Sequence, residues 1–132
     1  MDDRDLLDII RPVCGSDTCS DDCAILTLPC GALVTSTDML HERSDFPAGM
    51  TGWQIGWMSV AVTISDIAAM GAEPLQIVLA IGLDTEERLA EIVLGAQACC
   101  DTYGAVYAGG DLDAHSELTI VSTGVGIIRD GE

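Results

Sequence analysis

Residues 51–72, TGWQIGWMSVAVTISDIAAMGA, are the stretch that decides the fold. The first twenty of them contain no proline and are rich in alanine, methionine and isoleucine, which predicts one long helix. Gly71 follows as the expected C-cap, and Glu73-Pro74 marks the expected break before the next element. A helix of this length and apolarity must be covered by other elements, so the chain has to build a core around it.

A polar stripe runs along the predicted helix, because Ser59, Thr63 and Asp66 follow i, i+4, i+7 spacing on an otherwise apolar surface. One interpretation is that this stripe faces water. The stripe lacks the lysine, glutamate and arginine that normally cover a solvated helix face, so the alternative is a functional site. The sequence alone leaves both interpretations open.

The remaining elements follow from apolar runs separated by turn residues. They are a short amphipathic helix at 2–11, strands at 23–28 and 32–37 joined by a turn at 29–31, a polar loop at 41–50, a buried strand at 75–83, a helix from Asp84 to about Tyr103, and strands at 105–108 and 118–128. The order α-β-β-α-β-α-β-β predicts an α+β fold, with helices on one face of a mixed or antiparallel sheet.

That arrangement leaves the other face of the sheet uncovered. The strands are too apolar for solvent, so we expect a second copy of the chain to pack against this open face in a homodimer.

Length and charge restrict the possible partners. With 132 residues and 48% hydrophobic content, residues 1–132 are expected to form a single domain with its own core. The formal net charge of −17, from 22 acidic residues against five arginines and no lysine, argues against nucleic acid or an anionic membrane as a partner. A salt-adapted surface accounts for most of these carboxylates, so only those in unusual settings point to function.

The six cysteines do not predict disulfides or a metal centre. The start of the sequence, MDDRD, lacks the basic and apolar segments of a signal peptide, so we expect a reducing, cytoplasmic location. The cysteine spacings contain no C-x₂-C pair, and no apolar run approaches the length of a membrane span.

Four short segments place aspartates at the edges of apolar runs rather than in charged clusters. They are Ser20-Asp21-Asp22-Cys23, Ser36-Thr37-Asp38-Met39, Ser65-Asp66-Ile67 and Gly109-Gly110-Asp111. Carboxylates gathered in this way suit Mg²⁺, and the absence of lysine excludes a P-loop lysine as a phosphate clamp. Asp22 and Asp38 bracket the predicted hairpin, so their side chains are expected to converge, although each could also be an ordinary turn or cap residue.

The Gly109-Gly110-Asp111 segment resembles a turn in which glycines let backbone N–H groups approach a phosphate, but ordinary turns carry the same residues. His41 and His115 are isolated in polar segments, and no serine or cysteine nucleophile has an adjacent base. We therefore name no catalytic nucleophile.

In order and spacing, these segments and above all SDIAAMGA at 65–72 resemble thiamine-monophosphate kinase. The resemblance covers the amino-terminal half of that two-domain family, the half related to aminoimidazole ribonucleotide synthetase. It implies transfer of the ATP γ-phosphate to thiamine monophosphate with Mg²⁺ as the electrophile. It also implies a metal cluster held by Asp22, Ser36, Thr37, Asp38, Asp66 and Asp111, with Gly110 and Asp111 beside the ATP phosphates.

The sequence departs from the family at the substrate. Where relatives often have a histidine that touches the substrate, Asp45 precedes Phe46, and Leu112 replaces the threonine that follows Gly-Gly-Asp. The family's carboxy-terminal domain is missing, so we expect a fragment or an expressed domain that binds nucleotide weakly and does not turn over. Two alternatives stay open. One is another ATP-using enzyme of this fold, for hydrogenase maturation or for selenophosphate or purine synthesis, and the other is a non-catalytic dimerisation module.

Overall fold

The computed structural model describes residues 5–6, 8–9, 12 and 23–130. Asp22 therefore lies outside the described residues. The predicted helix at 2–11 is described only at 5–6 and 8–9, which are helical.

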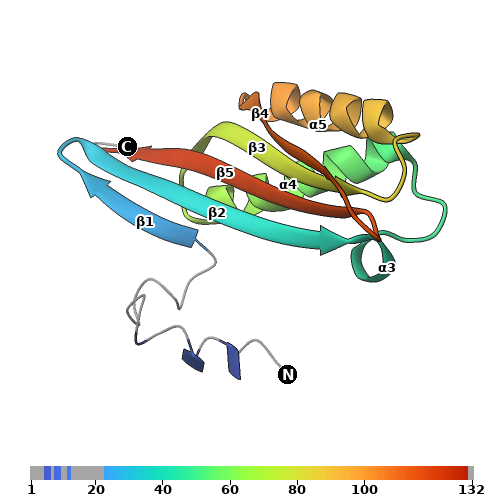
Figure 1. Ribbon diagram of the computed structural model, residues 1–132. Helices are drawn as coiled ribbons and strands as arrows, with labels where there is room; N and C mark the ends of the chain where they lie inside the picture. Colours follow the sequence, from blue (N-terminus) through green and yellow to red (C-terminus); the bar gives the residue numbers. More distant parts are fainter. Residues whose placement is uncertain (1–4, 7, 10–11, 13–22, 131–132) are drawn as a thin grey trace.

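The described chain forms a five-stranded sheet with helices packed against one face (Figure 1). The elements are β1 (Cys23–Leu28), β2 (Gly31–His41), α3 (Glu42–Asp45), α4 (Gly52–Ala69), β3 (Glu73–Leu83), α5 (Leu89–Tyr103), β4 (Val106–Ala114) and β5 (Thr119–Arg129). The strand order is β1-β2-β5-β3-β4, with β3 and β4 parallel and every other pair antiparallel. The predicted α+β fold with a mixed sheet is confirmed.

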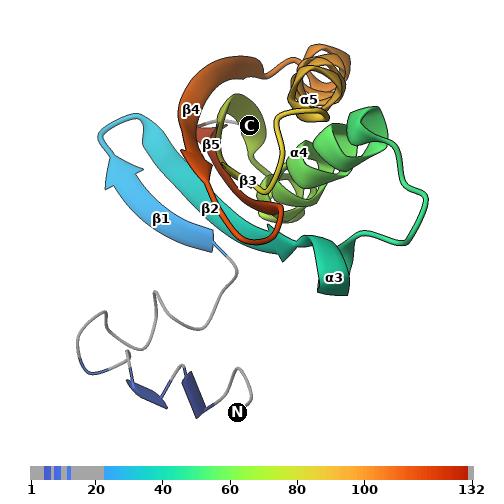
Figure 2. The ribbon, with the colours of Figure 1, turned by 45° about the vertical axis from the view of Figure 1, so that its right-hand side comes forward.

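Helix α4 lies where the sequence predicts it. Thr51 and Gln54 form a reciprocal capping box at its start, with hydrogen bonds of 3.1 Å and 2.9 Å between side chain and backbone. Gly71 follows its C-cap with a φ of 74°, a left-handed conformation that glycine adopts without strain. The helix packs beside α5 on the same face of the sheet, as Figure 2 shows.

The core fills the space between this helical layer and the sheet. Its largest fully buried side chains are Val34, Ile55, Val60, Ile67, Ile77, Leu79, Ile81, Ile92, Leu118 and Ile120. The two helices approach closely at two glycines. A Cβ on Gly56 would lie 1.9 Å from the carbonyl oxygen of Ile92, and a Cβ on Gly95 would lie 1.9 Å from that of Trp53. Close packing of α4 on α5 therefore requires a residue without a side chain at both positions.

Several element boundaries differ from the prediction. Strand β2 continues to His41 rather than ending at 37, because residues 37–41 all pair with β5. The predicted break at Glu73-Pro74 is wrong, since both residues belong to β3, and the sheet accommodates them by a register shift between Pro74 and Gln76. The polar loop at 41–50 contains the short helix α3, and α5 begins at Leu89 rather than at Asp84.

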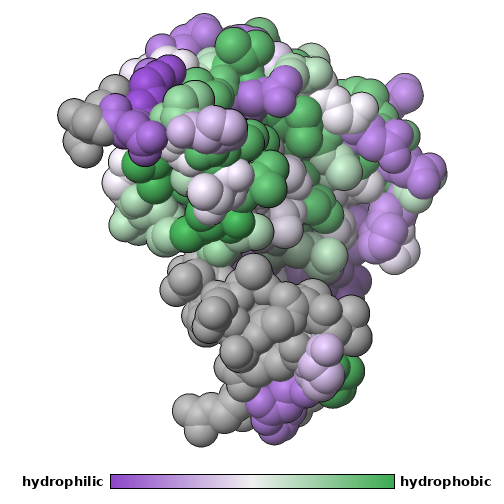
Figure 3. Space-filling model, turned by 90° about the vertical axis from the view of Figure 1, so that its left-hand side faces the viewer, coloured by the Kyte–Doolittle hydropathy of each residue, from purple (hydrophilic) through white to green (hydrophobic). Residues whose placement is uncertain are grey.

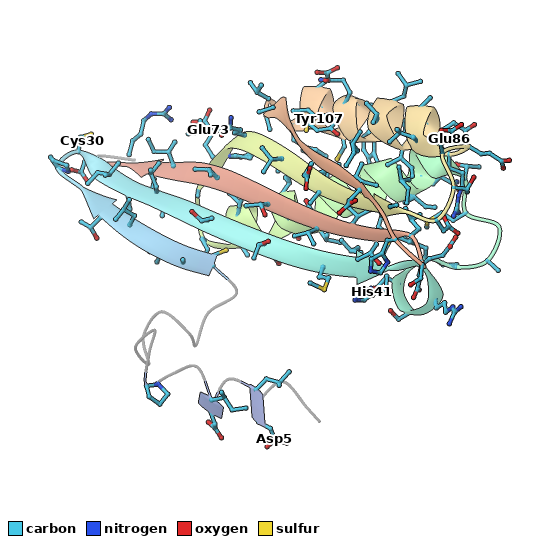
Figure 4. All side chains as sticks on the ribbon, in the orientation of Figure 1. Asp5, Cys30, His41, Glu73, Glu86 and Tyr107 are labelled. Carbon is cyan, nitrogen blue, oxygen red and sulfur yellow. The ribbon has the colours of Figure 1, made fainter. Side chains whose placement is uncertain are left out.

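The opposite face of the sheet carries no helix among the described residues. Alternate residues of β2 and β5 point to it, and its apolar side chains include Leu33, Met39, Val121, Val125 and Ile127. Met39 is 63% exposed. In Figure 4, Cys30 and His41 mark the two ends of β2 along this sheet. Within the part of the chain that is described, no helix is long and apolar enough to cross a membrane.

Candidate metal and phosphate site

Strand β2 and helix α4 bring two aspartates to the same gap between sheet and helix. Ser36 and Asp38 are two residues apart on β2, so both side chains point to the face that α4 covers. The Ser36 hydroxyl donates to Asp66 Oδ2 at 3.4 Å, and the Thr63 hydroxyl donates to Asp38 Oδ2 at 2.8 Å. These two hydrogen bonds cross the same β2–α4 interface in opposite directions, so both carboxylates lie along this interface.

The polar stripe on α4 faces the sheet. Ser59 and Thr63 are 0% exposed, which excludes the interpretation that these two residues lie in water. The Ser59 hydroxyl donates to its own helix, to the carbonyl oxygen of Ile55 at 2.8 Å, whereas Thr63 reaches across to β2 and β5. Asp66, nearer the end of the helix, is half-buried. The stripe therefore begins with Ser59, which bonds to its own helix, and continues with Thr63 and Asp66, which contact β2.

The oxygen atoms gathered here suit a hard divalent cation. Two half-buried carboxylates and a serine hydroxyl supply the oxygen donors that Mg²⁺ prefers. Among the described residues, no three histidine, cysteine, aspartate or glutamate side chains form a metal-binding group. Asp22, the remaining candidate in this part of the chain, lies outside the described residues.

Gly110 and Asp111 lie elsewhere than the sequence suggests. The segment is not a turn after a strand, because β4 continues through it to Ala114 with an irregularity in the β3–β4 pairing at this point. A Cβ on Gly110 would lie 1.8 Å from the carbonyl oxygen of Leu79, and its φ is 142°, so the strand itself requires glycine there. This structural requirement accounts for the glycine without a ligand.

The sheet register also separates Asp111 from Asp38. Gly110, Leu79, Ser122 and Asp38 form one row across four strands, which puts β4 three strand spacings, about 14 Å, from β2. Asp111 pairs with Ala80, which points away from the helices, so its side chain belongs to the open face. A single chain thus does not bring Asp111 to the gap that holds Asp38 and Asp66.

Thr37 is also on the open face. Its hydroxyl lies 2.9 Å from the hydroxyl of Thr123, its neighbour on β5, and the side chain is exposed. Its neighbours Ser36 and Asp38 point to the helices instead, as the alternation of a strand requires. The segment Ser36-Thr37-Asp38 therefore contributes side chains to both faces of the sheet.

Asp45, the candidate substrate residue, ties α3 to the end of β2. Its Oδ2 accepts a hydrogen bond from the backbone N–H of His41 at 2.7 Å and another from the Ser44 hydroxyl at 3.1 Å. Nearby, Arg88 forms an ion pair with Glu42 at 2.6 Å, and this hydrogen bond is the main cause that raises the pKa of Arg88. That arginine is held by a carboxylate rather than presented to a phosphate.

Cys99 and Cys100 lie in the core. Burial raises the pKa of Cys99 and of Cys100 to about 11, and both side chains are 0% exposed. Protonated, buried thiols are inert packing groups, so this pair contributes to packing rather than to chemistry.

Ser122 is the site residue that the sequence analysis missed. It is 0% exposed, and its hydroxyl oxygen lies 2.7 Å from that of Thr63. The available signal was a serine at an inward-pointing position of an apolar strand, between Ile120 and Gly124. Only the register of β5 against β2 reveals that this serine lies opposite Asp38.

Comparison with known proteins places the chain in a family. Residues 20–128 match the family described as "AIR synthase related protein, N-terminal domain". The chain is 99% identical over all 132 residues to the thiamine-monophosphate kinase of Methanospirillum hungatei JF-1, of which it covers 46%. The chain thus spans less than half the length of this curated relative.

Solved structures share the fold. The structure described as AaThiL complexed with AMPPCP and TMP is similar with a TM-score of 0.89 and 25% identity, over 96% of this chain and 42% of that one. A HypE–HypF complex is similar with a TM-score of 0.77 and 20% identity, over 96% and 43%, which indicates the fold alone. The chain belongs to the AIR synthase-related family, and it corresponds to the N-terminal domain of that family.

Proposed function

We propose that this chain is the Mg²⁺- and ATP-binding domain of a thiamine-monophosphate kinase. The observation that carries the proposal is that Asp38 and Asp66 lie along one β2–α4 interface, where the buried hydroxyl groups of Thr63 and Ser36 donate hydrogen bonds to them. The near-identity to the Methanospirillum hungatei kinase supports the choice of reaction. The likeness to a structure complexed with AMPPCP, an ATP analogue, and TMP supports the choice of substrates.

Phosphoryl transfer between ATP and thiamine monophosphate needs charge neutralisation and alignment rather than a covalent intermediate. Asp38, Asp66 and Ser36, together with Asp22 as the resemblance implies, would hold Mg²⁺, which would supply positive charge to the transferring phosphoryl group. The chain has no lysine to do this. Asp38 and Asp66 each present a carboxylate at the β2–α4 interface before the nucleotide binds.

Three further residues are candidates for contact with the two substrates. Gly110 and Asp111 border the ATP phosphates, and Asp45 borders the thiamine monophosphate. Because Asp111 lies on the open face, we infer that its contribution is made to a ligand or a subunit on that side of the sheet rather than to the cation at Asp38. Thr37, on the same face, belongs with this second group.

The open face also supports a homodimer. Apolar side chains of β2 and β5 point outwards there, and Leu26 of β1, paired with Leu33, is 61% exposed. Figure 3 views the end of the molecule where the β1–β2 turn lies, and it shows hydrophobic surface interrupted by hydrophilic side chains. A second copy packed face to face would cover these apolar groups and leave the helices outside.

The test uses the longer Methanospirillum hungatei relative and this chain in parallel. Formation of thiamine diphosphate from ATP and thiamine monophosphate is measured with Mg²⁺, in the parent and in a variant with asparagine at the position of Asp38. We expect activity in the longer protein, its loss in the variant, and no turnover by residues 1–132 alone. Full activity of the asparagine variant would contradict the proposed metal site. Turnover by residues 1–132 would contradict the expectation that this domain alone is not sufficient for catalysis.

A further inference from the structure

A chain of buried hydroxyl groups leads from the centre of the sheet to one of the proposed metal ligands. The Thr63 hydroxyl oxygen lies 2.8 Å from Asp38 Oδ2, 2.7 Å from Ser122 Oγ and 3.4 Å from the Ser122 carbonyl oxygen. Thr63 and Ser122 are both 0% exposed. Three structural elements, α4, β5 and β2, therefore meet at these three side chains without water between them.

The direction of the hydrogen bonds follows from what each group can donate. A threonine hydroxyl has one proton, and an ionised carboxylate can only accept. The Thr63 proton therefore goes to Asp38, and the second contact requires the Ser122 hydroxyl to donate to the Thr63 oxygen. The result is a directed series, Ser122 to Thr63 to Asp38, in which the middle hydroxyl both accepts and donates.

This series acts on one oxygen of the carboxylate. Thr63 engages Oδ2, and within residues 23–130 no other hydrogen bond is made to the Asp38 carboxylate. With Oδ2 held, the carboxylate plane cannot rotate freely, so the position of Oδ1 is fixed as well. A neutral donor leaves the full negative charge on the carboxylate, whereas an arginine or lysine in its place would compete with a cation.

We propose that Thr63 and Ser122 are positioning residues that hold the Asp38 carboxylate in the orientation that binds the divalent cation. Neither residue touches the cation, and both act through Asp38. The inference rests on the proposed function, because it takes Asp38 as a metal ligand. Partners that orient a metal ligand in this way typically change metal affinity about 10- to 100-fold when they are removed.

The experiment measures Mn²⁺ affinity of residues 1–132 by titration calorimetry, with five variants. Thr63→Val removes the hydroxyl and keeps the shape, Thr63→Ser keeps the hydroxyl, and Ser122→Ala removes only the far end of the series. Ser59→Ala is the matched control, because it removes another fully buried hydroxyl from the same face of α4 that does not contact Asp38. Asp38→Asn tests the ligand itself.

We expect Thr63→Val to weaken Mn²⁺ binding about tenfold and Ser122→Ala about threefold, with Thr63→Ser and Ser59→Ala close to the parent. In the Asp38→Asn background, Thr63→Val should change the residual affinity no further, because its effect passes through Asp38. Thermal unfolding of each variant confirms that binding is measured on folded protein. Should Thr63→Val not fold, Ser122→Ala and Thr63→Ser carry the comparison.

Three outcomes overturn the inference, and they differ in whether the proposed metal site is also contradicted. If Asp38→Asn loses affinity while Thr63→Val and Ser122→Ala bind as the parent does, the positioning role is wrong and the metal site stands. If Asp38→Asn also binds as the parent does, the metal site is wrong and the positioning role falls with it. Equal losses in Thr63→Val and Ser59→Ala would indicate a general loss of packing, which also contradicts the inference.

Discussion

Polar side chains are buried on one face of the sheet and exposed on the other. On the face under α4 and α5, the few polar side chains are buried and paired, as Ser36, Thr63 and Ser122 show. On the open face, Thr37 and Asp111 are exposed among apolar side chains such as Met39. The covered face is packed within one chain, whereas the polar groups of the open face are exposed and no helix of the described residues covers them.

The largest contrast is expected between thiols. Burial raises the pKa of Cys99 and Cys100 to about 11, whereas Cys30 is exposed in the β1–β2 turn. Burial keeps Cys99 and Cys100 both protonated and out of contact with the reagent, so alkylation at pH ~8 should label the exposed Cys30 about 100 times faster than the buried pair. Mass spectrometry after timed iodoacetamide treatment measures this.

The same raised pKa predicts a sign for stability. The folded state holds these two protons more tightly than the unfolded state, so their stabilisation is complete below pH ~9 and is lost as the pH rises through about 11.

In the labelling experiment, equal rates for Cys30, Cys99 and Cys100 in folded protein would show that reagent reaches the core beneath the helices.

Replacing one glycine, Gly95, is expected to disrupt the packing of α4 on α5. Gly95→Ala would place a Cβ 1.9 Å from the Trp53 carbonyl oxygen, and backbone atoms cannot move aside easily. Overpacking of about 3 kcal/mol, less the ~1 kcal/mol that alanine gains over glycine in a helix, should lower the free energy of unfolding by about 2 kcal/mol. Urea unfolding measures this, with Thr102→Ala on the exposed side of α5 as the control. No loss in Gly95→Ala would contradict the close α4–α5 contact.

The open face can be tested with a charge. Met39→Glu places a carboxylate in the proposed dimer interface, where an unpaired charge is costly to bury, and should raise the dimer dissociation constant about tenfold or more. Leu94→Glu on α5 is the matched control, because Leu94 and Met39 are both 63% exposed. Light scattering over a dilution series gives the dissociation constants. A monomeric parent, or equal effects of both substitutions, would remove the proposed dimer.

The smallest effect is expected at the surface. Arg129 forms an ion pair with Glu73 at the end of the sheet, and both side chains are substantially exposed. Exposed pairs contribute at most about 1 kcal/mol, so Glu73→Gln, which leaves Arg129 in place, should change the free energy of unfolding by less than that, and less still at high salt. Urea unfolding at two salt concentrations provides the measurement. A loss above that of Gly95→Ala would mean that the ion pair, rather than the covered core, holds this end of the sheet.

The sequence predicted what local chemistry controls. The span of α4, its Gly71 cap and the turn at 29–31 follow from residue type and spacing alone. The convergence of Asp38 and Asp66 was implied by family resemblance, and the direction of the stripe on α4 could not be decided. Both depend on how α4 lies across β2, which is a property of tertiary packing.

The errors arise in the sheet. Gly109-Gly110 has the composition of a turn, but pairing with β3 draws it into a strand, and the three-strand distance from Asp38 to Gly110 depends on strand order. Ser122 became a site residue only through its pairing opposite Asp38. Register and strand order are set by long-range contacts, which a single sequence does not reveal.

Paramagnetic broadening by Mn²⁺ in isotope-labelled residues 1–132 shows whether a divalent cation binds between β2 and α4. We expect substoichiometric Mn²⁺ to broaden first the amide signals around Ser36, Asp38 and Asp66, and Asp38→Asn to remove this effect. With a net charge of −17, weak binding over the acidic surface is the competing result. Broadening centred on exposed acids such as Glu86 and Glu87, with the β2–α4 signals unchanged, would contradict the account.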